Sequence, residues 1–352
     1  MYEIETIEAV ELLKKMISIP SISREETMVA DFFENFIKEK GFNPERLGNN
    51  LYIFGNQYDE TKKTILLNSH IDTVKPVSGW TIDPFSATET NGKIYGVGSN
   101  DAGASVVSLF EAFCILNKTK LPYNLIYLAS AEEEISGKNG IEWAMKKLPK
   151  IDLAVIGEPT NMKMAIAEKG LMVLDCVVYG KAGHAARDEG ENAIYKAIKE
   201  IDWFQNYTFE KKSELLGNVK MSVTQINSGT QHNVVPDKCT FIVDIRSNEL
   251  YSNEELLEII KEKISCEVSA RSTRLSSTKT PDNHCIIQKA KKLNIDLFGS
   301  PTLSDQALLS CVSVKIGPGN SERSHTANEF IALNEIKEAI EKYVELLVNL
   351  IF

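Results

Sequence analysis

The chain has 352 residues, of which 43% are hydrophobic and 25% are charged, a composition typical of a soluble globular protein with about two domains. Its formal net charge of −10 argues against a nucleic-acid-binding surface and against binding to anionic membranes. The sequence has no apolar run long enough to span a bilayer. Its six cysteines lack C-x-x-C spacing, which favours buried thiols in a reducing compartment, and we therefore expect a cytoplasmic protein.

The first part of the chain alternates helical and strand patterns. Apolar residues at helical spacing predict an amphipathic helix over residues 1–16, rather than a signal peptide, and a second helix over 25–40. Short apolar runs separated by helical patterns predict strands at 50–56, 63–71, 124–130 and 152–157 and helices at 103–118 and 140–147. Apolar strands that alternate with helices indicate an α/β fold, with a mostly parallel sheet covered by helices on both faces.

From about Lys169 the pattern changes to strands in which apolar and polar residues alternate. The expected elements are strands at 170–180, 219–229 and 237–247 and helices at 191–204 and 252–265. Their β-α-β-β-α order is that of a small two-layer α+β domain. The α/β pattern then resumes with a helix at 286–295, a strand at 313–319 and a helix at 333–350. We therefore predict one α/β domain (1–168 and 272–352) interrupted by an inserted α+β domain (169–271).

Histidines and acidic residues follow the predicted core strands of the α/β domain. They are His70, Asp72, the run Glu132–Glu134, Glu158 and His325, and Asp101 directly precedes a helix. In open α/β sheets ligands bind beyond the carboxyl ends of the strands. Imidazole and carboxylate groups suit zinc or a similar divalent ion, and a carboxylate with one oxygen for each ion can bridge two of them. Residues two apart in an extended chain face the same way, so Asp72 either orients the ring of His70 or binds metal itself.

Eight motifs, all in the same order, resemble the ArgE/DapE family of di-zinc deacylases and carboxypeptidases over essentially the whole chain. They are SHIDTV (69–74), GVGSNDAGA (96–104), SAEEEISGKNG (130–140), IGEPT (156–160), GKAGHAA (180–186), HNVVP (232–236), DIR (244–246) and ERSHTANE (322–329). The resemblance implies a zinc-peptidase-like catalytic domain with an inserted dimerisation or lid domain, and a homodimer. Relatives commonly carry Lys-Gly shortly after the aspartate, whereas Ala102-Gly103-Ala104 follows Asp101 here, which leaves the subfamily open.

The resemblance also assigns metal ligands and a proton carrier. Two zinc ions, with cobalt as an alternative, would be held by His70 and Glu158, by Glu134 and His325, and by a bridging Asp101, with Asp72 behind His70. Glu133 would be the general base, because Glu134 stands six residues before Gly140 as the metal-binding glutamate does in the family. Glu132 receives no role. Taken alone, each histidine would more often be a core or surface residue, and Glu158 could merely cap a turn.

The remaining assignments concern the substrate. His184, reaching the site from the partner subunit, would donate to the oxyanion. Asn233 and Arg246 would bind substrate, although Arg246 could instead be a structural ion-pair partner. The turn that contains Gly317 and Gly319 could offer backbone N–H groups to a substrate carboxylate.

The segment GPGNSERSHTANEF (317–330) and the short chain resemble the acetylornithine deacetylase and amino-group-carrier-lysine hydrolase branch of this family. This resemblance implies removal of an acetyl or succinyl group from the α-nitrogen of ornithine or a related basic amino acid, in arginine biosynthesis. The alternatives that would use the same metal site are a succinyl-diaminopimelate desuccinylase, an acyl-lysine hydrolase, and a dipeptidase or exopeptidase. A non-catalytic relative would lack a ligand or the base, and the sequence retains them all.

Overall fold

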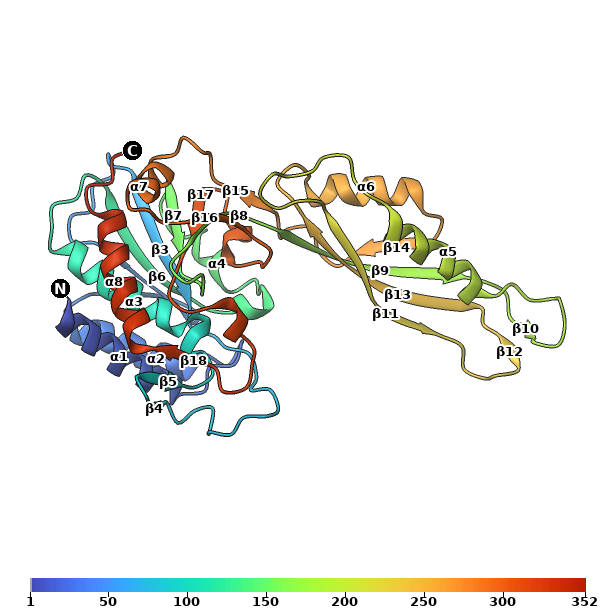
Figure 1. Ribbon diagram of the computed structural model, residues 1–352, viewed down its shortest axis with the longest axis horizontal. Coiled ribbons are helices and arrows are strands. Elements are labelled where there is room, and N and C mark those ends of the chain that lie inside the picture. The colour runs from blue at the N-terminus through green and yellow to red at the C-terminus, as the bar shows by residue number, and fades with distance from the viewer. Residues whose placement is uncertain (1) are drawn as a thin grey trace. The chain divides into compact units, whose positions relative to one another are not determined.

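A computed structural model describes residues 2–352, and the chain divides into two compact units (Figure 1). Unit 1 contains the chain up to Ile166 together with Thr280–Phe298 and Ser304–Phe352. Unit 2 contains Ala167–Lys279 and Gly299–Leu303. Within residues 2–352, none of the helices combines the length and the apolar character needed to cross a membrane.

A sheet of mostly parallel strands forms the centre of unit 1 (Figure 1). β3 (Thr64–His70) runs parallel to β6 (Asn124–Ser130) and to β7 (Leu153–Ile156), and β17 (Val312–Lys315) runs parallel to β7. The strands that pair antiparallel at its margins are β1 (Glu45–Leu47), β2 (Asn50–Phe54) and β8 (Met164–Glu168), and β16 (Leu297–Ser300) also pairs with β8. β15 (Thr278–Lys279), whose residues belong to unit 2, pairs with the last two residues of β8. The register places His70 opposite Ser130, so the carboxyl ends of β3 and β6 lie at the same edge.

Helices cover both faces of this sheet, which confirms the predicted α/β fold. The helices of unit 1 are α1 (Glu3–Ile17), α2 (Thr27–Glu39), α3 (Ala104–Asn117), α4 (Ile141–Ala144), α7 (Cys285–Lys292) and α8 (Leu333–Leu347). Alternate residues of β6 face opposite layers, as the two-residue period of a strand requires. Ile126 packs in one cluster with Ile141 of α4, whereas the ring of Tyr127 meets the edges of the Phe33 and Phe110 rings on the other side.

Unit 1 differs from the sequence expectation in several places, among them a shortened helix and an additional small sheet. The helix expected at 140–147 is regular only over α4, and the chain to Leu148 continues as hydrogen-bonded turns. A small antiparallel sheet that the sequence pattern did not predict is formed by β4 (Thr88–Thr90), β5 (Lys93–Tyr95) and β18 (Phe330–Ala332). Three-residue strands are too short to show a two-residue alternation, which explains why they were missed.

Unit 2 is a four-stranded antiparallel sheet with two helices on one face (Figure 1). In sheet order the strands are β11 (Lys220–Ser228), β13 (Lys238–Ser247), β9 (Gly170–Tyr179) and β14 (Glu267–Ala270), and the helices are α5 (Ala193–Asn206) and α6 (Asn253–Lys263). A short ribbon pairs β10 (Gly183–His184) with β12 (Val234–Val235). Along β9, buried Met172, Leu174, Cys176 and Val178 alternate with partly exposed residues, and this apolar face packs on the helices.

Candidate metal centre

The end of β3 places a buried histidine at the edge of the sheet. The Nδ1 atom of His70 lies 2.9 Å from the backbone oxygen of Asp72 and 3.5 Å from its Oδ1. A proton on Nδ1 therefore has acceptors, and Nε2 is left to face Asp101 Oδ1 at 3.3 Å and Glu158 Oε1 at 3.8 Å. This is the arrangement in which a neutral histidine offers its outer nitrogen to a metal ion.

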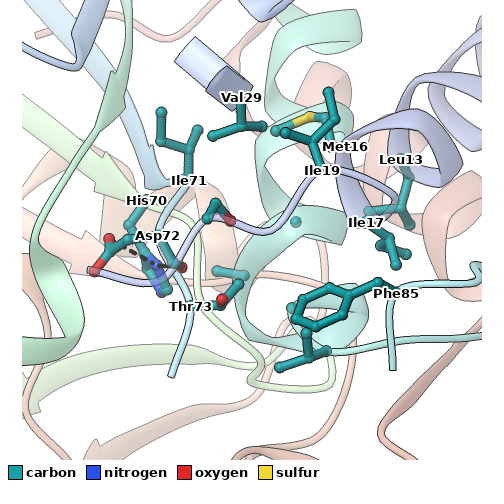
Figure 2. A pocket seen from close by; sticks show the side chains of 15 residues that line it. Leu13, Met16, Ile17, Ile19, Val29, His70, Ile71, Asp72, Thr73 and Phe85 are labelled. Atoms are coloured by element: carbon teal, nitrogen blue, oxygen red, sulfur yellow. Dashed lines mark hydrogen bonds and ion pairs between the residues drawn. The ribbon is translucent and has the colours of Figure 1, made fainter. Parts of the chain in front are cut away.

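The wall behind this histidine is apolar. Figure 2 shows His70 and Asp72 at one side of a small cavity whose other walls are apolar side chains from α1, α2 and the neighbouring loops. These include Leu13, Met16, Ile17, Ile19, Val29 and Phe85. The cavity volume is about 20 Å³, close to the space that one water molecule needs. The candidate ligands Asp101 and Glu158 lie on the other side of the ring, toward Nε2.

Asp101 faces two separate groups of candidate ligands. One possible donor atom each from His70, Asp101 and Glu158 lie within 4.8 Å of one another, and the same holds for Asp101, Glu134 and His325. The two oxygens of Asp101 are divided between the histidines, because Oδ1 lies 3.3 Å from His70 Nε2 and Oδ2 lies 3.6 Å from His325 Nε2. A carboxylate shared in this way suits a bridge between two divalent cations. The donor set of two imidazoles and three carboxylates also suits zinc or a similar ion.

The electrostatics of the site call for added positive charge. Burial raises the pKa of Glu158 to about 8 and, reinforced by the charge of Glu158, raises the pKa of Glu133 well above its usual range. The hydrogen bond between His325 Nε2 and Glu134 Oε2, 2.9 Å long, raises the pKa of His325 to about 9. Several carboxylates so close together repel one another, and divalent cations would remove this repulsion.

The three consecutive glutamates, Glu132–Glu134, have different surroundings. Glu133 and Glu134 lie in a 3-10 turn after β6, and Glu133 Oε2 is 3.9 Å from His70 Nε2. The Glu132 carboxylate instead accepts hydrogen bonds from the side chain and backbone of Asn139, at 2.9 and 3.3 Å. Its backbone N–H donates to the buried Glu26 carboxylate at 3.2 Å. Glu132, for which no role was predicted, therefore fixes the loop from which the other two glutamates project.

Asp72 also holds this loop. Its Oδ1 accepts the backbone N–H of Glu133 at 3.0 Å, and its Oδ2 accepts the backbone N–H of Glu134 at 3.2 Å and the hydroxyl of Ser23 at 2.7 Å. Burial disfavours the ionised form, but the hydrogen bonds from His70 and from these donors hold the pKa of Asp72 below its usual range. Asp72 is thus an ionised residue that contacts both His70 and the loop that carries Glu133 and Glu134.

The glycine turn lies beside the candidate ligands and is tightly constrained. A Cβ atom on Gly317 would stand 2.5 Å from the backbone oxygen of Glu158, and one on Gly319, whose φ is +83°, would stand 2.2 Å from Asn100 Oδ1. The N–H of Gly317 donates to Thr160 Oγ1 at 3.0 Å. A substrate carboxylate could reach that N–H only by displacing Thr160, so the role expected for Gly317 stays a prediction.

The other three expected site residues belong to unit 2. His184, at the end of β10, is exposed, and its Nδ1 accepts the backbone N–H of Ala186 at 3.1 Å, which leaves the proton of the neutral ring on Nε2. Asn233 is next to this ribbon, because its backbone oxygen accepts the N–H of Ala185. Arg246 donates to both oxygens of Asp244, at 2.8 and 3.1 Å. The ion-pair role considered for Arg246 therefore exists in the fold, whereas its substrate role stays a prediction.

Sequence reasoning missed several buried acids that support the candidate ligands. Asp305 Oδ2 accepts hydrogen bonds from Asn68 and Ser130 at 2.9 and 2.7 Å, which ties the ends of β3 and β6 together. Glu329 accepts the backbone N–H groups of Gly98, Asn100 and Asp101 at 3.2, 2.8 and 3.0 Å. Glu329 stands in the motif that contains His325, so its position carried a signal, whereas no feature of the sequence around Asp305 distinguishes it.

Comparison with known proteins extends these observations. A family model described as Peptidase family M20/M25/M40 matches residues 66–349. The succinyl-diaminopimelate desuccinylase of Wolbachia pipientis wMel is 29% identical to the chain, with 97% of this chain and 93% of that protein covered. The LysW-lysine/LysW-ornithine hydrolase of Sulfurisphaera tokodaii is 31% identical, with 95% of this chain and 93% of that protein covered.

Solved structures share the fold. An M20 family metallo-carboxypeptidase from Sulfolobus solfataricus gives a TM-score of 0.74 at 20% identity, with 99% of each chain covered. A dinuclear metal-binding M20 peptidase of Bacillus subtilis gives a TM-score of 0.73 at 15% identity, with 98% of each chain covered. At these low sequence identities, the similarity to the two structures shows a shared fold only.

Proposed function

The chain belongs to Peptidase family M20/M25/M40, and we propose that it is a di-metal amide hydrolase that removes the acyl group from a small N-acyl amino acid. The match confirms the resemblance to ArgE/DapE-type hydrolases that the sequence motifs predicted. The observation that carries the proposal is the position of Asp101, whose two oxygens face different histidines at 3.3 and 3.6 Å.

Two divalent ions, zinc or cobalt, would be held by the residues around Asp101. His70 and Glu158 would complete one site and Glu134 and His325 the other, because each pair lies with Asp101 in one cluster of donor atoms. When bound, such ions supply Lewis acidity, which polarises an amide carbonyl and lowers the pKa of water. Asp72 would keep His70 in the required tautomer through the Nδ1 contacts described above.

Glu133 would carry the proton. Burial raises the pKa of this carboxylate, and the positive charge of bound ions would favour its ionised form, which can accept a proton from water and return it to the leaving amine. The hydrogen bond between its backbone N–H and Asp72 fixes where the side chain begins, so a rigid peptide unit carries the base. His184, Asn233, Arg246, Gly317 and Gly319 stay proposals for oxyanion stabilisation and substrate binding.

The substrate would be an N-acetyl or N-succinyl derivative of a basic amino acid. The Sulfurisphaera relative supports ornithine or lysine as the amino acid, as in arginine biosynthesis, and the Wolbachia relative supports succinyl-diaminopimelate. These two readings are equally supported, and both require hydrolysis of a linear amide next to a free carboxylate. We place the reaction in the cytoplasm.

A homodimer formed through unit 2 would complete the site if His184 acts in the partner subunit. Unit 2 offers surface for such contact, because Tyr195 and Ile198 of α5 are 70% and 54% exposed and Ile226 of β11 is 51% exposed. β11 is also an edge strand of the four-stranded sheet. Exposed apolar side chains beside an open strand edge favour association.

A comparison of kcat/KM for N-acetylornithine, N-succinylornithine, N-succinyl-diaminopimelate, N-acyl-lysine and a dipeptide panel, with zinc- and cobalt-loaded protein, tests the function. We expect an acyl amino acid to be hydrolysed at least tenfold better than any dipeptide. Glu133→Gln should abolish turnover while two metal ions per chain are retained. Preference for dipeptides would favour an exopeptidase, and full activity of the variant would overturn the role of Glu133.

A further inference from the structure

Asn100, directly before Asp101, joins three segments of the candidate metal centre. Its side chain is completely buried. Its Nδ2 donates to the backbone oxygen of Asn320 at 3.1 Å, and its Oδ1 accepts the backbone N–H of Asn320 at 2.9 Å. One amide group thus satisfies both backbone groups of a residue that lies 220 positions away along the chain.

The segment held in this way carries His325 and meets the segment that follows Glu158. Asn320 begins the turn Ser321–Arg323, two residues before His325, and its own side chain caps that turn by accepting the N–H of Glu322. Asn320 also forms an isolated antiparallel bridge with Thr160. The side chain of His325 is 52% exposed and lies outside helices and strands, so its position depends on how this loop is held.

A second contact links Asn100 to the bridging carboxylate. Its Nδ2 donates to the hydroxyl oxygen of Ser324 at 3.3 Å, and the Ser324 side chain, as a hydrogen-bond donor, helps to lower the pKa of Asp101. A hydroxyl has a single proton, and when its oxygen accepts from an amide N–H that proton is free for an acceptor elsewhere. The donor from Asn100 therefore leaves the Ser324 proton available to Asp101.

We propose that Asn100 is a positioning residue that fixes Asp101, His325 and the glycine turn as one unit. It would thereby set the affinity of the centre for its second metal ion, the one that Glu134 and His325 would hold. This role rests on the proposed function, because it concerns the ions that the di-metal hydrolase would bind. The backbone of Asn100 is itself fixed, since its N–H donates to the Glu329 carboxylate at 2.8 Å. Glu329 and Asn100 thus connect the Asp101 turn to the same C-terminal segment at two points.

Three variants distinguish the contacts that the Asn100 side chain makes with Asn320 from those it makes with Ser324. Asn100→Ala removes all side-chain contacts, and Ser324→Ala removes only the hydroxyl. Asn100→Asp has nearly the same shape but replaces the amide donor by an oxygen, which faces the Asn320 oxygen and competes with Asp101 for the Ser324 proton. An added negative charge beside the site would by itself tighten cation binding, so weaker binding by Asn100→Asp reports the lost contacts rather than the charge.

Asn124→Ala is the matched control. Asn124 is also a buried asparagine of unit 1 that bonds to the backbone, through Asp59 N and O, but it stands at the amino end of β6, away from the candidate ligands. Its replacement should lower the melting temperature without a change in metal affinity. Any general effect of removing a buried amide thus appears in the control as well.

Titration of metal-free protein with Co²⁺, followed by calorimetry and by the visible absorption of the bound ion, tests the role. We expect both Asn100 variants to bind the second ion about 10- to 100-fold more weakly than the unaltered protein, with a smaller loss for Ser324→Ala. Excess metal should then restore part of their activity, which a merely damaged fold would not allow.

If the Asn100→Asp and Ser324→Ala proteins fold and bind both ions with unaltered affinity, the positioning role is wrong, whatever the stability of Asn100→Ala. If the unaltered protein binds fewer than two ions, the di-metal function itself is wrong. The two failures are therefore distinguishable in the same titration.

Discussion

The backbone N–H of Glu133 donates to Asp72 Oδ1 at 3.0 Å, so the residue behind the candidate ligand His70 also holds the candidate general base. Asp72 is completely buried and accepts further hydrogen bonds from Glu134 N–H and Ser23. One carboxylate thus fixes an imidazole on β3 and the glutamate turn after β6. If His70 binds metal and Glu133 carries the proton as proposed, this group would couple the two functions.

Asp72→Asn should therefore impair both steps. The amide keeps the shape but can place an oxygen on only one side, so one backbone N–H loses a good acceptor and the His70 tautomer is no longer favoured by a charge. We expect metal affinity to fall about 10- to 100-fold and kcat to stay reduced when metal is saturating. Calorimetric metal titration and kinetics at saturating metal separate these effects. Ser23→Ala, which removes only the hydroxyl bond to Asp72, is the control and should lose less than Asp72→Asn in both measurements.

The structure brings the candidate ligands that the sequence predicted close together, and several of them follow a strong local pattern. His70 ends a strand of seven buried residues, and Glu133 and Glu134 follow another, so periodicity and position alone bring them to one edge of the sheet. The change in pattern near Lys169 could also be read from the sequence, because apolar and polar residues alternate regularly along long strands such as β9.

The residues that hold the site could not be predicted in this way. Asp305 lies 237 positions from Asn68 and 175 from Ser130, and Glu132 meets Glu26 across 106 positions. Their roles come from tertiary contacts that leave no periodic trace in the sequence. A buried acid that accepts backbone hydrogen bonds and one that binds metal also look alike until their neighbours are known.

Removal of metal should destabilise the protein more at high pH than at low pH. Glu158 has its pKa raised to about 8 from an ordinary value of 4.5, so the protonated form stabilises the metal-free fold below pH 4.5. That contribution is lost as the pH rises through 8. Melting temperatures with and without a chelator should therefore diverge from pH 5 to pH 9.

Glu158→Gln distinguishes the destabilising effect of the buried Glu158 charge from the contribution of metal binding. Above pH 8 the metal-free variant should melt at a higher temperature than the metal-free unaltered protein, because one buried charge is gone. With zinc or cobalt added the order should reverse, because a candidate ligand is gone and the ion stabilises the unaltered fold in proportion to its affinity. The same order in both conditions would contradict a metal-binding role for Glu158.

Gly319→Ala should disturb the same loop that Asn100 holds. The φ of Gly319 is +83°, which disfavours any side chain, and the new Cβ would stand 2.2 Å from Asn100 Oδ1. We expect a loss of stability of about 1–3 kcal/mol and weaker metal binding, because Asn100 must move away from Asn320. Gly92→Ala also has a positive φ, of +69°, but its Cβ would meet no atom within 4 Å. The control should lose stability by backbone strain alone and keep its metal affinity, as calorimetry can measure.

Glu111 in α3 is a buried acid that is not one of the candidate ligands and has no part in the proposed chemistry. It is 2% exposed, its Oε1 has no hydrogen-bond partner within residues 2–352, and burial raises its pKa from 4.5 to about 7. A raised pKa in the fold means that stability is fully present below pH 4.5 and is lost as the pH rises through 7. The shift corresponds to at most about 3 kcal/mol at pH 8.

Glu111→Gln should therefore be more stable than the unaltered protein at pH 8 and nearly equal to it at pH 4.5, where the native carboxyl is protonated. Metal-binding groups titrate alike in both proteins, so they cancel in the difference between the two. Urea unfolding at several pH values measures this difference directly, and activity at pH 8 should be unchanged. A stability difference that does not vary with pH would show that Glu111 is not a protonated buried acid at low pH, and would assign any gain to packing instead.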